Sequence, residues 1–180
     1  MKNIFKATLF GGIAGGVGDL IYAFIVFGPL TFHAPPDRIL RSIAAGWMGR
    51  ATARAGGWDV TLLGLASHFF IAIVMAGAFV FASAALPALR RRPIVWGVLY
   101  GIWLTLAMNY LIVPLTAVET GQFASSVGDA ATRIQAAVSA IPGDATGSPW
   151  IFAGQFFTHT VLVALPISLI NARLNQPQQA

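Results

Sequence analysis

The sequence predicts an all-α fold: a four-helix transmembrane bundle with two amphipathic interfacial helices. Three observations lead to this prediction. Hydrophobic residues make up 57% of the chain and charged residues 9%, whereas soluble domains hold roughly half and roughly a quarter. Four stretches approach or exceed the roughly 20 apolar residues needed to cross the hydrocarbon core of a bilayer. Prolines lie at or near the ends of these stretches, where a missing backbone amide costs little.

The four spans are expected at about residues 8–30, 60–86, 94–117 and 150–171. Pro29 is expected to close the first span and Asp59 to cap the second. Pro166 lies inside the fourth span and should kink it near its end, because a proline lacks the amide hydrogen and its ring crowds the preceding turn. The length of 180 residues predicts one integral membrane domain over residues 1–180.

The start of the chain has the charge pattern of a secretory signal peptide, with Lys2 and Lys6 before an apolar run. The apolar core of a signal peptide is roughly 7–15 residues long and ends at a small-residue cleavage site. Here the run is long enough to span the membrane and carries Asp19 at its centre. We therefore expect an uncleaved first helix.

Each of the two long connections between spans contains a predicted helix at the membrane interface. In residues 31–59, Asp37 is expected to cap a helix. Its apolar face comprises Ile39, Leu40, Ile43, Trp47 and Met48. In residues 118–149, apolar residues recur at helical spacing, namely Phe123, Val127, Ala131, Ile134 and Val138. The opposite side of that helix is polar and comprises Ser125, Ser126, Asp129 and Arg133. A solvated loop remains the alternative for each connection.

Basic residues give conflicting signals for orientation. The run Arg90–Arg92 lies in a very short loop, where the preference of basic residues for the cytoplasm is strongest. It places both termini in the cytoplasm and both long connections on the other side. Five arginines in those connections oppose this assignment: Arg38, Arg41, Arg50, Arg54 and Arg133.

Several polar side chains are predicted at membrane depth, where an ionisable residue costs roughly 2.5–3.5 kcal/mol by insertion scales. The expected buried polar cluster comprises Asp19, His68, Asn109, His159 and Gln155. Glycines share the helix faces of its members, and small residues let helices approach closely. The glycines expected to pack helices are Gly11, Gly12, Gly15, Gly16, Gly97 and Gly101.

The cluster supports three interpretations. It can be a structural network of hydrogen bonds, because lone transmembrane histidines are usually hydrogen-bonded structural residues. It can be a site that responds to protons or a cation, because a carboxylate and an imidazole both change charge. It can also hold haem or a metal ion, with His68, His159 and Asp19 as candidate ligands. The metal assignment stays open, and we expect no cofactor because dense ligand motifs are missing from the sequence.

Other chemistries find little support. The chain has no cysteine, which excludes thiolate catalysis and cysteine-ligated metals. The run Gly11–Gly16 lies in an apolar span and lacks the following Lys-Ser/Thr of a phosphate loop. Ser67 and His68 are adjacent, so they face different sides of a helix and cannot act as a catalytic pair. The cations form short runs instead of a basic face, so we expect no nucleic-acid binding. No motif points to a named reaction, so we expect no enzymatic activity.

The chain resembles a family of small uncharacterised bacterial inner-membrane proteins with four spans. The resemblance rests on three groups of segments: Arg38–Gly46 with Gly64–Phe69; Leu99–Gly101 with Met108–Tyr110 and Pro114–Leu115; and His159 with Leu165–Ile167. It covers most of the chain and implies a multi-pass protein of the cell inner membrane. It supplies no site residues.

Together these observations predict a membrane protein of unknown biochemical activity, either a small proton- or cation-responsive protein related to transport or an accessory protein. The alternative is a structural or assembly subunit without its own chemistry, and the further alternative is a haem- or metal-binding protein. The expected partner is the lipid bilayer, and the glycine faces also suit a homo-oligomer or a membrane partner protein.

Overall fold

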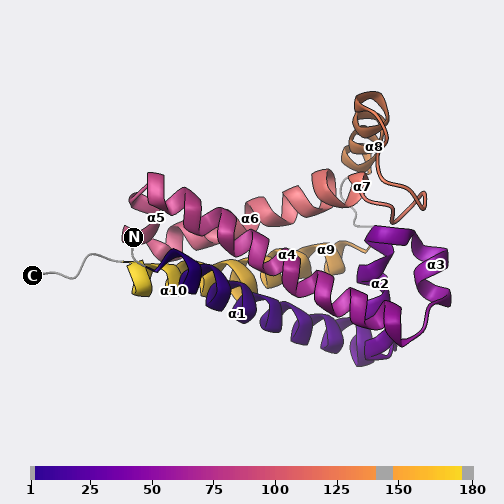
Figure 1. Ribbon diagram of the computed structural model, residues 1–180, viewed down its shortest axis with the longest axis horizontal. Coiled ribbons are helices and arrows are strands. Elements are labelled where there is room, and N and C mark those ends of the chain that lie inside the picture. Colours follow the sequence, from indigo (N-terminus) through magenta and orange to yellow (C-terminus); the bar gives the residue numbers. More distant parts are fainter. Residues whose placement is uncertain (1–2, 141–147, 176–180) are drawn as a thin grey trace, which may run out of the picture. The chain divides into compact units, whose positions relative to one another are not determined.

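The computed structural model describes residues 3–140 and 148–175. All regular secondary structure in these residues is helical (Figure 1). Four helices are long and apolar enough to cross a membrane: Ile4–Leu30, Trp58–Ala85, Pro93–Leu115 and Pro149–Asn175. The predicted all-α fold with four spans is therefore confirmed, and each predicted span overlaps an observed one. The chain is a multi-pass membrane protein.

Three of the four spans contain a π-helical segment, and in the first span this segment is kinked at Gly28, whose backbone angles (φ −77°, ψ −111°) are not helical. The first comprises α1 (Ile4–Ile25) and η1 (Val26–Leu30); the third comprises α6 (Pro93–Ala107), η2 (Met108–Ile112) and α7 (Val113–Leu115); the fourth comprises α9 (Pro149–Phe157), η3 (Thr158–Ala164) and α10 (Leu165–Asn175). The second span is the continuous α4 (Trp58–Ala85). Sequence reasoning expected a kink at Pro166 alone.

A proline lies in or just after each π-helical segment. Pro29 lies inside η1, Pro114 follows η2 and Pro166 follows η3. At the end of η3, the amide of Leu165 donates to the carbonyl of Thr160, five residues back. This wider turn gives room to a proline ring, which would crowd the carbonyl four residues back in an α-helix.

In the described parts of the connections there are four shorter helices: α2 (Pro36–Met48), α3 (Arg50–Ala55), α5 (Ala88–Arg91) and α8 (Val127–Ser139). The predicted cap by Asp37 is wrong. Pro35 is the N-cap of α2 without a side-chain bond, and Asp37 lies inside the first turn, where its carboxylate accepts a hydrogen bond from Arg41 at 2.5 Å. Asp59 likewise lies inside the first turn of α4 instead of preceding it.

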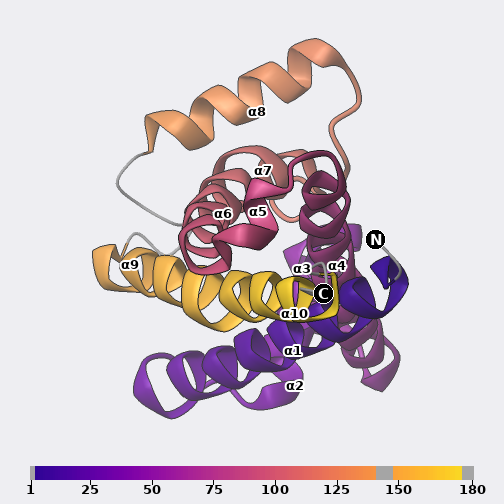
Figure 2. The ribbon, with the colours of Figure 1, turned by 90° about the vertical axis from the view of Figure 1, so that its left-hand side faces the viewer.

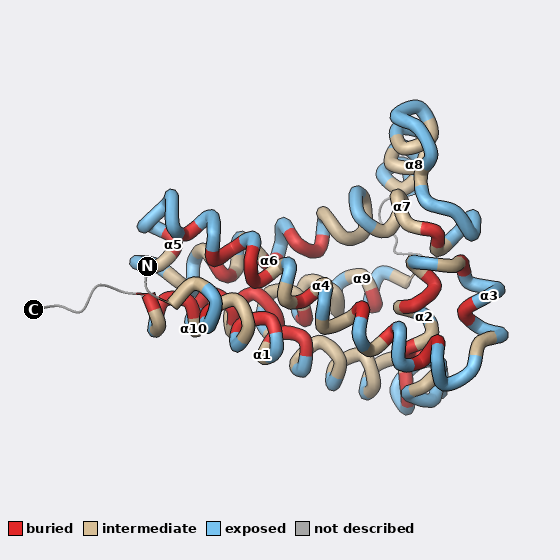
Figure 3. Tube along the Cα trace, in the orientation of Figure 1, coloured by how far each residue is buried: buried red, intermediate tan, exposed pale blue. Residues whose placement is uncertain are grey.

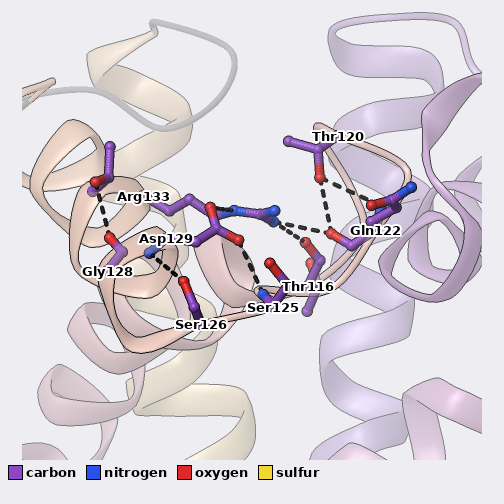
Figure 4. A network of polar contacts seen from close by, with 9 residues as sticks. Thr116, Thr120, Gln122, Ser125, Ser126, Gly128, Asp129 and Arg133 are labelled. Atoms are coloured by element: carbon purple, nitrogen blue, oxygen red, sulfur yellow. Dashed lines mark hydrogen bonds and ion pairs between the residues drawn. The ribbon is translucent and has the colours of Figure 1, made fainter.

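The second connection contains a helix where one was predicted, α8, and the structure shows what its polar side contacts. Ser126 caps α8 by accepting from the amide of Asp129 at 3.1 Å. Arg133 binds Asp129 through Nε at 2.8 Å and donates to the backbone oxygens of Thr116 and Gln122 (Figure 4). The polar side of α8 therefore holds the connection together, while Val127 on the predicted apolar face is 88% exposed.

The chain divides into two compact units, and each span contributes residues to both. Unit 1 comprises Met1–Tyr22, Phe69–Leu104 and Phe156–Ala180; unit 2 comprises Ala23–His68 and Thr105–Gln155. In unit 1, α10 lies beside α1 (Figure 2) and contributes several buried residues (Figure 3). The hydrophobic core of unit 1 comprises Ala76, Phe79, Leu89, Leu104, Val163, Ala164 and Ile167.

Unit 2 has a smaller core of Ala44, Ala45, Ala53 and Val60. In this unit α2 packs directly on α4, because Gly64 leaves room for the backbone of α2. A Cβ atom at Gly64 would lie 1.9 Å from the carbonyl oxygen of Leu40. Trp47 joins the same two helices by donating its indole hydrogen to the Ser67 hydroxyl at 2.8 Å.

Unit 1 also contains a buried polar network that the sequence did not single out. The side-chain amide of Asn171 donates to the Ser83 hydroxyl at 2.9 Å, and Asn175 donates to Asn171 at 3.1 Å. Ser83 and Asn171 are fully buried. Asn3 adds a bond to the carbonyl of Leu174 at 2.9 Å. These bonds tie α4, α10 and the start of the chain together.

Candidate functional site

The glycines of α1 allow two other spans to approach it closely. On one side, Cβ atoms at Gly11 and Gly15 would lie 3.3 Å from the Cα atoms of Ile167 and Val163, in the fourth span. On the other side, a Cβ atom at Gly12 would lie 2.6 Å from Cα of Ile73 in α4. Gly11 and Gly15 therefore face the fourth span, and Gly12 faces α4. At these positions a larger residue would hold the helix backbones apart.

Asp19 lies on the side of α1 that approaches the fourth span. Its carboxylate oxygen Oδ1 accepts a hydrogen bond from the hydroxyl of Thr158 at 2.9 Å. Thr158 is 3% exposed and begins η3, while Asp19 is half-buried. Gly18 directly precedes Asp19, and a Cβ atom there would lie 2.9 Å from the carbonyl oxygen of Leu162, one helical turn after Thr158. The close approach of the backbones thus brings this carboxylate to the π-helical segment.

His159 follows Thr158 on η3 and is half-buried. The Asp19 carboxylate is close enough to interact electrostatically with His159 and with Tyr22. Tyr22 also packs against Phe157, with ring centroids 6.1 Å apart. Unit 1 therefore places a carboxylate, a hydroxyl and an imidazole near one another in the first and fourth spans. The carboxylate and the imidazole are groups that can take up or release a proton.

The third span approaches η3 through another glycine. A Cβ atom at Gly101 would lie 2.4 Å from Cα of Thr160 and 2.8 Å from the carbonyl oxygen of His159. Gly97, one turn earlier, lies against Ser168, whose Oγ would be 2.5 Å from an added Cβ. The backbone that carries His159 is thus in contact with α6, which limits how far this turn can move.

Asn109 and Gln155 form a second polar group, which belongs to unit 2. The Asn109 side-chain amide donates to Oε1 of Gln155 at 2.6 Å and to the carbonyl of Thr105 at 2.8 Å. The Thr105 hydroxyl donates to the Gln155 carbonyl at 3.4 Å. These groups are neutral, so they hold α9 to the third span without titrating.

The five residues expected in one cluster therefore belong to two compact units. Asp19 and His159 come together in unit 1, and Asn109 binds Gln155 in unit 2. His68 belongs to unit 2, where it is half-buried and directly follows Ser67, the partner of Trp47. Within residues 3–140 and 148–175, no three His, Asp or Glu side chains gather in a way that could hold a metal ion.

Sequence reasoning missed Thr158 as the direct partner of Asp19. A threonine in an apolar span is common, because its hydroxyl can bond to the carbonyl of the preceding turn. The presence of a threonine at this position therefore gives no functional signal. The available sign in the sequence was its position beside His159.

Comparisons of the chain with protein-family models, with curated proteins and with solved structures find no match. The functional argument therefore depends on the geometry of the site alone.

Proposed function

We propose that this protein is a small proton-responsive membrane protein, related to transport or accessory to it, and that Asp19 and His159 are its responsive pair. The observation that carries the proposal is the bond from Thr158 to Asp19, and His159 is supported by its electrostatic interaction with the same carboxylate. Holding a carboxylate in an apolar span is costly. Such residues commonly mark paths for ions or protons.

The roles of the three side chains follow from their chemistry. Asp19 takes up or releases the proton, and the imidazole of His159 is the second group of the pair that can carry a charge. Thr158 orients the carboxylate by donating to one of its oxygens. Because η3 is a π-helical segment, a change of charge there acts on an irregular turn, a feature often found at functional sites.

The proposal includes a location. We place the protein in a bacterial inner membrane among the small four-span proteins that its sequence resembles, with both termini in the cytoplasm. The support is the Arg90–Arg92 run in a short connection between spans and the preference of such runs for the cytoplasm. Because the chain has no cysteine, single cysteines introduced at Ala88 and Thr52 would report orientation by labelling from either side.

A structural or assembly role is the rival proposal. The glycine contacts of α1 and the buried pair of Asn171 and Ser83 favour it, because they stabilise helix packing without titratable groups. In this case α1 and α6 would pack against neighbouring helices or a partner protein, and the Asp19 bond would contribute only to stability.

Proton uptake by reconstituted vesicles after an acid pulse separates the two proposals. We expect the wild-type response to disappear in Asp19→Asn and in the double variant His68→Gln/His159→Gln. The matched control is His33→Asn, which removes an exposed histidine outside the spans and suits its left-handed backbone (φ +48°). A response that persists in the double histidine variant would contradict the proton-site proposal and favour the structural role.

A further inference from the structure

Unit 2 contains an arginine-rich pocket at the bend between α2 and α3. Gly49 makes this bend with a left-handed backbone (φ +84°), a conformation that glycine adopts at little cost. A Cβ atom at Gly49 would also lie 2.8 Å from Cα of Gly121. The bend brings arginines from both helices to one cavity of about 80 Å³: Arg38, Arg41, Arg50 and Arg54.

A larger cavity of about 490 Å³ adjoins the first and has walls of two kinds. Three of the arginines line one part of it, and Phe27 and Phe32 line another. The two rings are stacked with centroids 6.0 Å apart. Its volume lies in the range of small-molecule sites. A ligand that carries both a charged group and an apolar part would fit these walls.

The charges around the pocket are only partly balanced. Arg41 pairs with Asp37 at 2.5 Å, and Arg50 pairs with Glu119. Among the described residues, no carboxylate pairs with Arg38 or Arg54. In addition, Nε of Arg41 is buried without a hydrogen-bond partner in this part of the chain. Guanidinium groups held around one cavity repel each other, and a bound anion would offset that repulsion.

The pocket begins where the first span ends. Phe27 belongs to η1, the last turn of that span, and Arg38 lies in the first turns of α2. The end of an apolar span lies at the level of the lipid headgroups. Arginines held together at this level attract anionic headgroups of the adjoining leaflet, because the planar guanidinium fork matches the oxygens of a phosphate.

We propose that this pocket binds the phosphate group of an anionic phospholipid, with Arg38 and Arg54 as its main contacts and the apolar part of the lipid against Phe27 and Phe32. The site is independent of the Asp19 and His159 pair, since all its lining residues belong to unit 2. Its failure would therefore leave the proposed function untouched.

The test is native mass spectrometry of the full chain released from nanodiscs that contain phosphatidylglycerol and phosphatidylcholine in equal amounts. Wild-type protein should retain phosphatidylglycerol preferentially. The variant Arg38→Gln/Arg54→Gln should lower that occupancy about tenfold or more, because each lost bond is charge-assisted. The matched control Arg91→Gln/Arg92→Gln removes two exposed arginines from the α5 connection and should leave the occupancy unchanged.

A second variant distinguishes a lipid headgroup from free phosphate as the bound group. It also controls for a folding defect in the arginine variant. Phe32→Ala removes a side chain that is 52% exposed and should lower lipid retention while sparing the binding of inorganic phosphate. An equal loss of lipid in the test variant Arg38→Gln/Arg54→Gln and in the control Arg91→Gln/Arg92→Gln would overturn the proposal, because lipid binding would then follow net charge alone. Binding of inorganic phosphate without any preference between the two lipids would also overturn it.

Discussion

The second and fourth spans of this bundle differ in their backbone conformation. α4 continues as α-helix for 28 residues and holds no proline, whereas the fourth span changes to π-helix over Thr158–Ala164 just before Pro166. The candidate proton pair includes a residue of the irregular span. The comparison indicates that proline, through the wide turn it requires, sets where the backbone presents Thr158 and His159 to α1.

A proline placed in α4 should break this comparison and have the largest effect. Val74→Pro would remove a helical hydrogen bond and crowd the carbonyl of Phe70, at a cost of about 3 kcal/mol or more in the free energy of unfolding. Val74 is 53% exposed, so Val74→Ala is a control for the lost side chain and should change little. Unfolding in mixed detergent, followed by tryptophan fluorescence, measures both. Equal stability of the two variants would contradict the account.

The next effect concerns the room that α6 leaves for η3. Gly101→Ala would push a Cβ atom to within 2.4 Å of Cα of Thr160, and such overpacking costs about 1–3 kcal/mol. Gly77→Ala is the matched control, because its nearest neighbour is Cγ2 of Thr8 at 3.5 Å, an ordinary contact. We expect the unfolding midpoint to fall for Gly101→Ala alone. A similar fall for both would mean that the wide turn does not press on α6.

Removing the hydroxyl on η3 should have a smaller effect on stability. Thr158→Val keeps the branched shape but removes the donor to Asp19, and side-chain hydrogen bonds in a bilayer contribute about 0.6 kcal/mol on average. The same unfolding assay measures the difference, with Thr8→Val as control because the Thr8 hydroxyl is buried without a partner among the described residues. If Thr158→Val lowered the free energy of unfolding more than Gly101→Ala does, Thr158 would do more than orient the carboxylate.

The smallest effect is expected outside the spans, in α8, where water screens charges. The hydrogen bond from Arg133 holds the pKa of Asp129 below its ordinary value of 3.8. This ion pair therefore stabilises α8 fully above that value, and its contribution is lost as the pH falls through the lowered pKa. A carbon NMR titration of the Asp129 carboxyl should give a midpoint below 3.8 that rises in Arg133→Gln. An unchanged midpoint would contradict the assignment.

The spans could be predicted from the sequence because apolar length alone determines them. The π-helical segments could not, because a proline inside a span allows a kink, a widened turn or a helix end. The contacts of α8 could not be predicted either. Apolar periodicity indicated the helix, yet Asp129 and Arg133 pack against the connection through specific hydrogen bonds, which periodicity does not encode.

The candidate site was predicted in part. Depth and helical spacing singled out Asp19 and His159, because ionisable residues are rare in spans. Their partners depend on which helices are neighbours, and a single sequence does not specify the order of helices around a bundle. The bond from Thr158 to Asp19 and the pairing of Asn109 with Gln155 therefore required the structure.

The most direct test of the account is whether the protonation of Asp19 depends on His159. Infrared difference spectra of the protein in vesicles would show the carboxyl band if they are recorded from about pH 3 to about pH 8, the range in which carboxyl and histidine side chains ordinarily titrate. Asp19→Asn would assign the band. The account predicts that this band changes at a different pH in His159→Gln than in the wild type. A band with the same pH dependence in both proteins would contradict it.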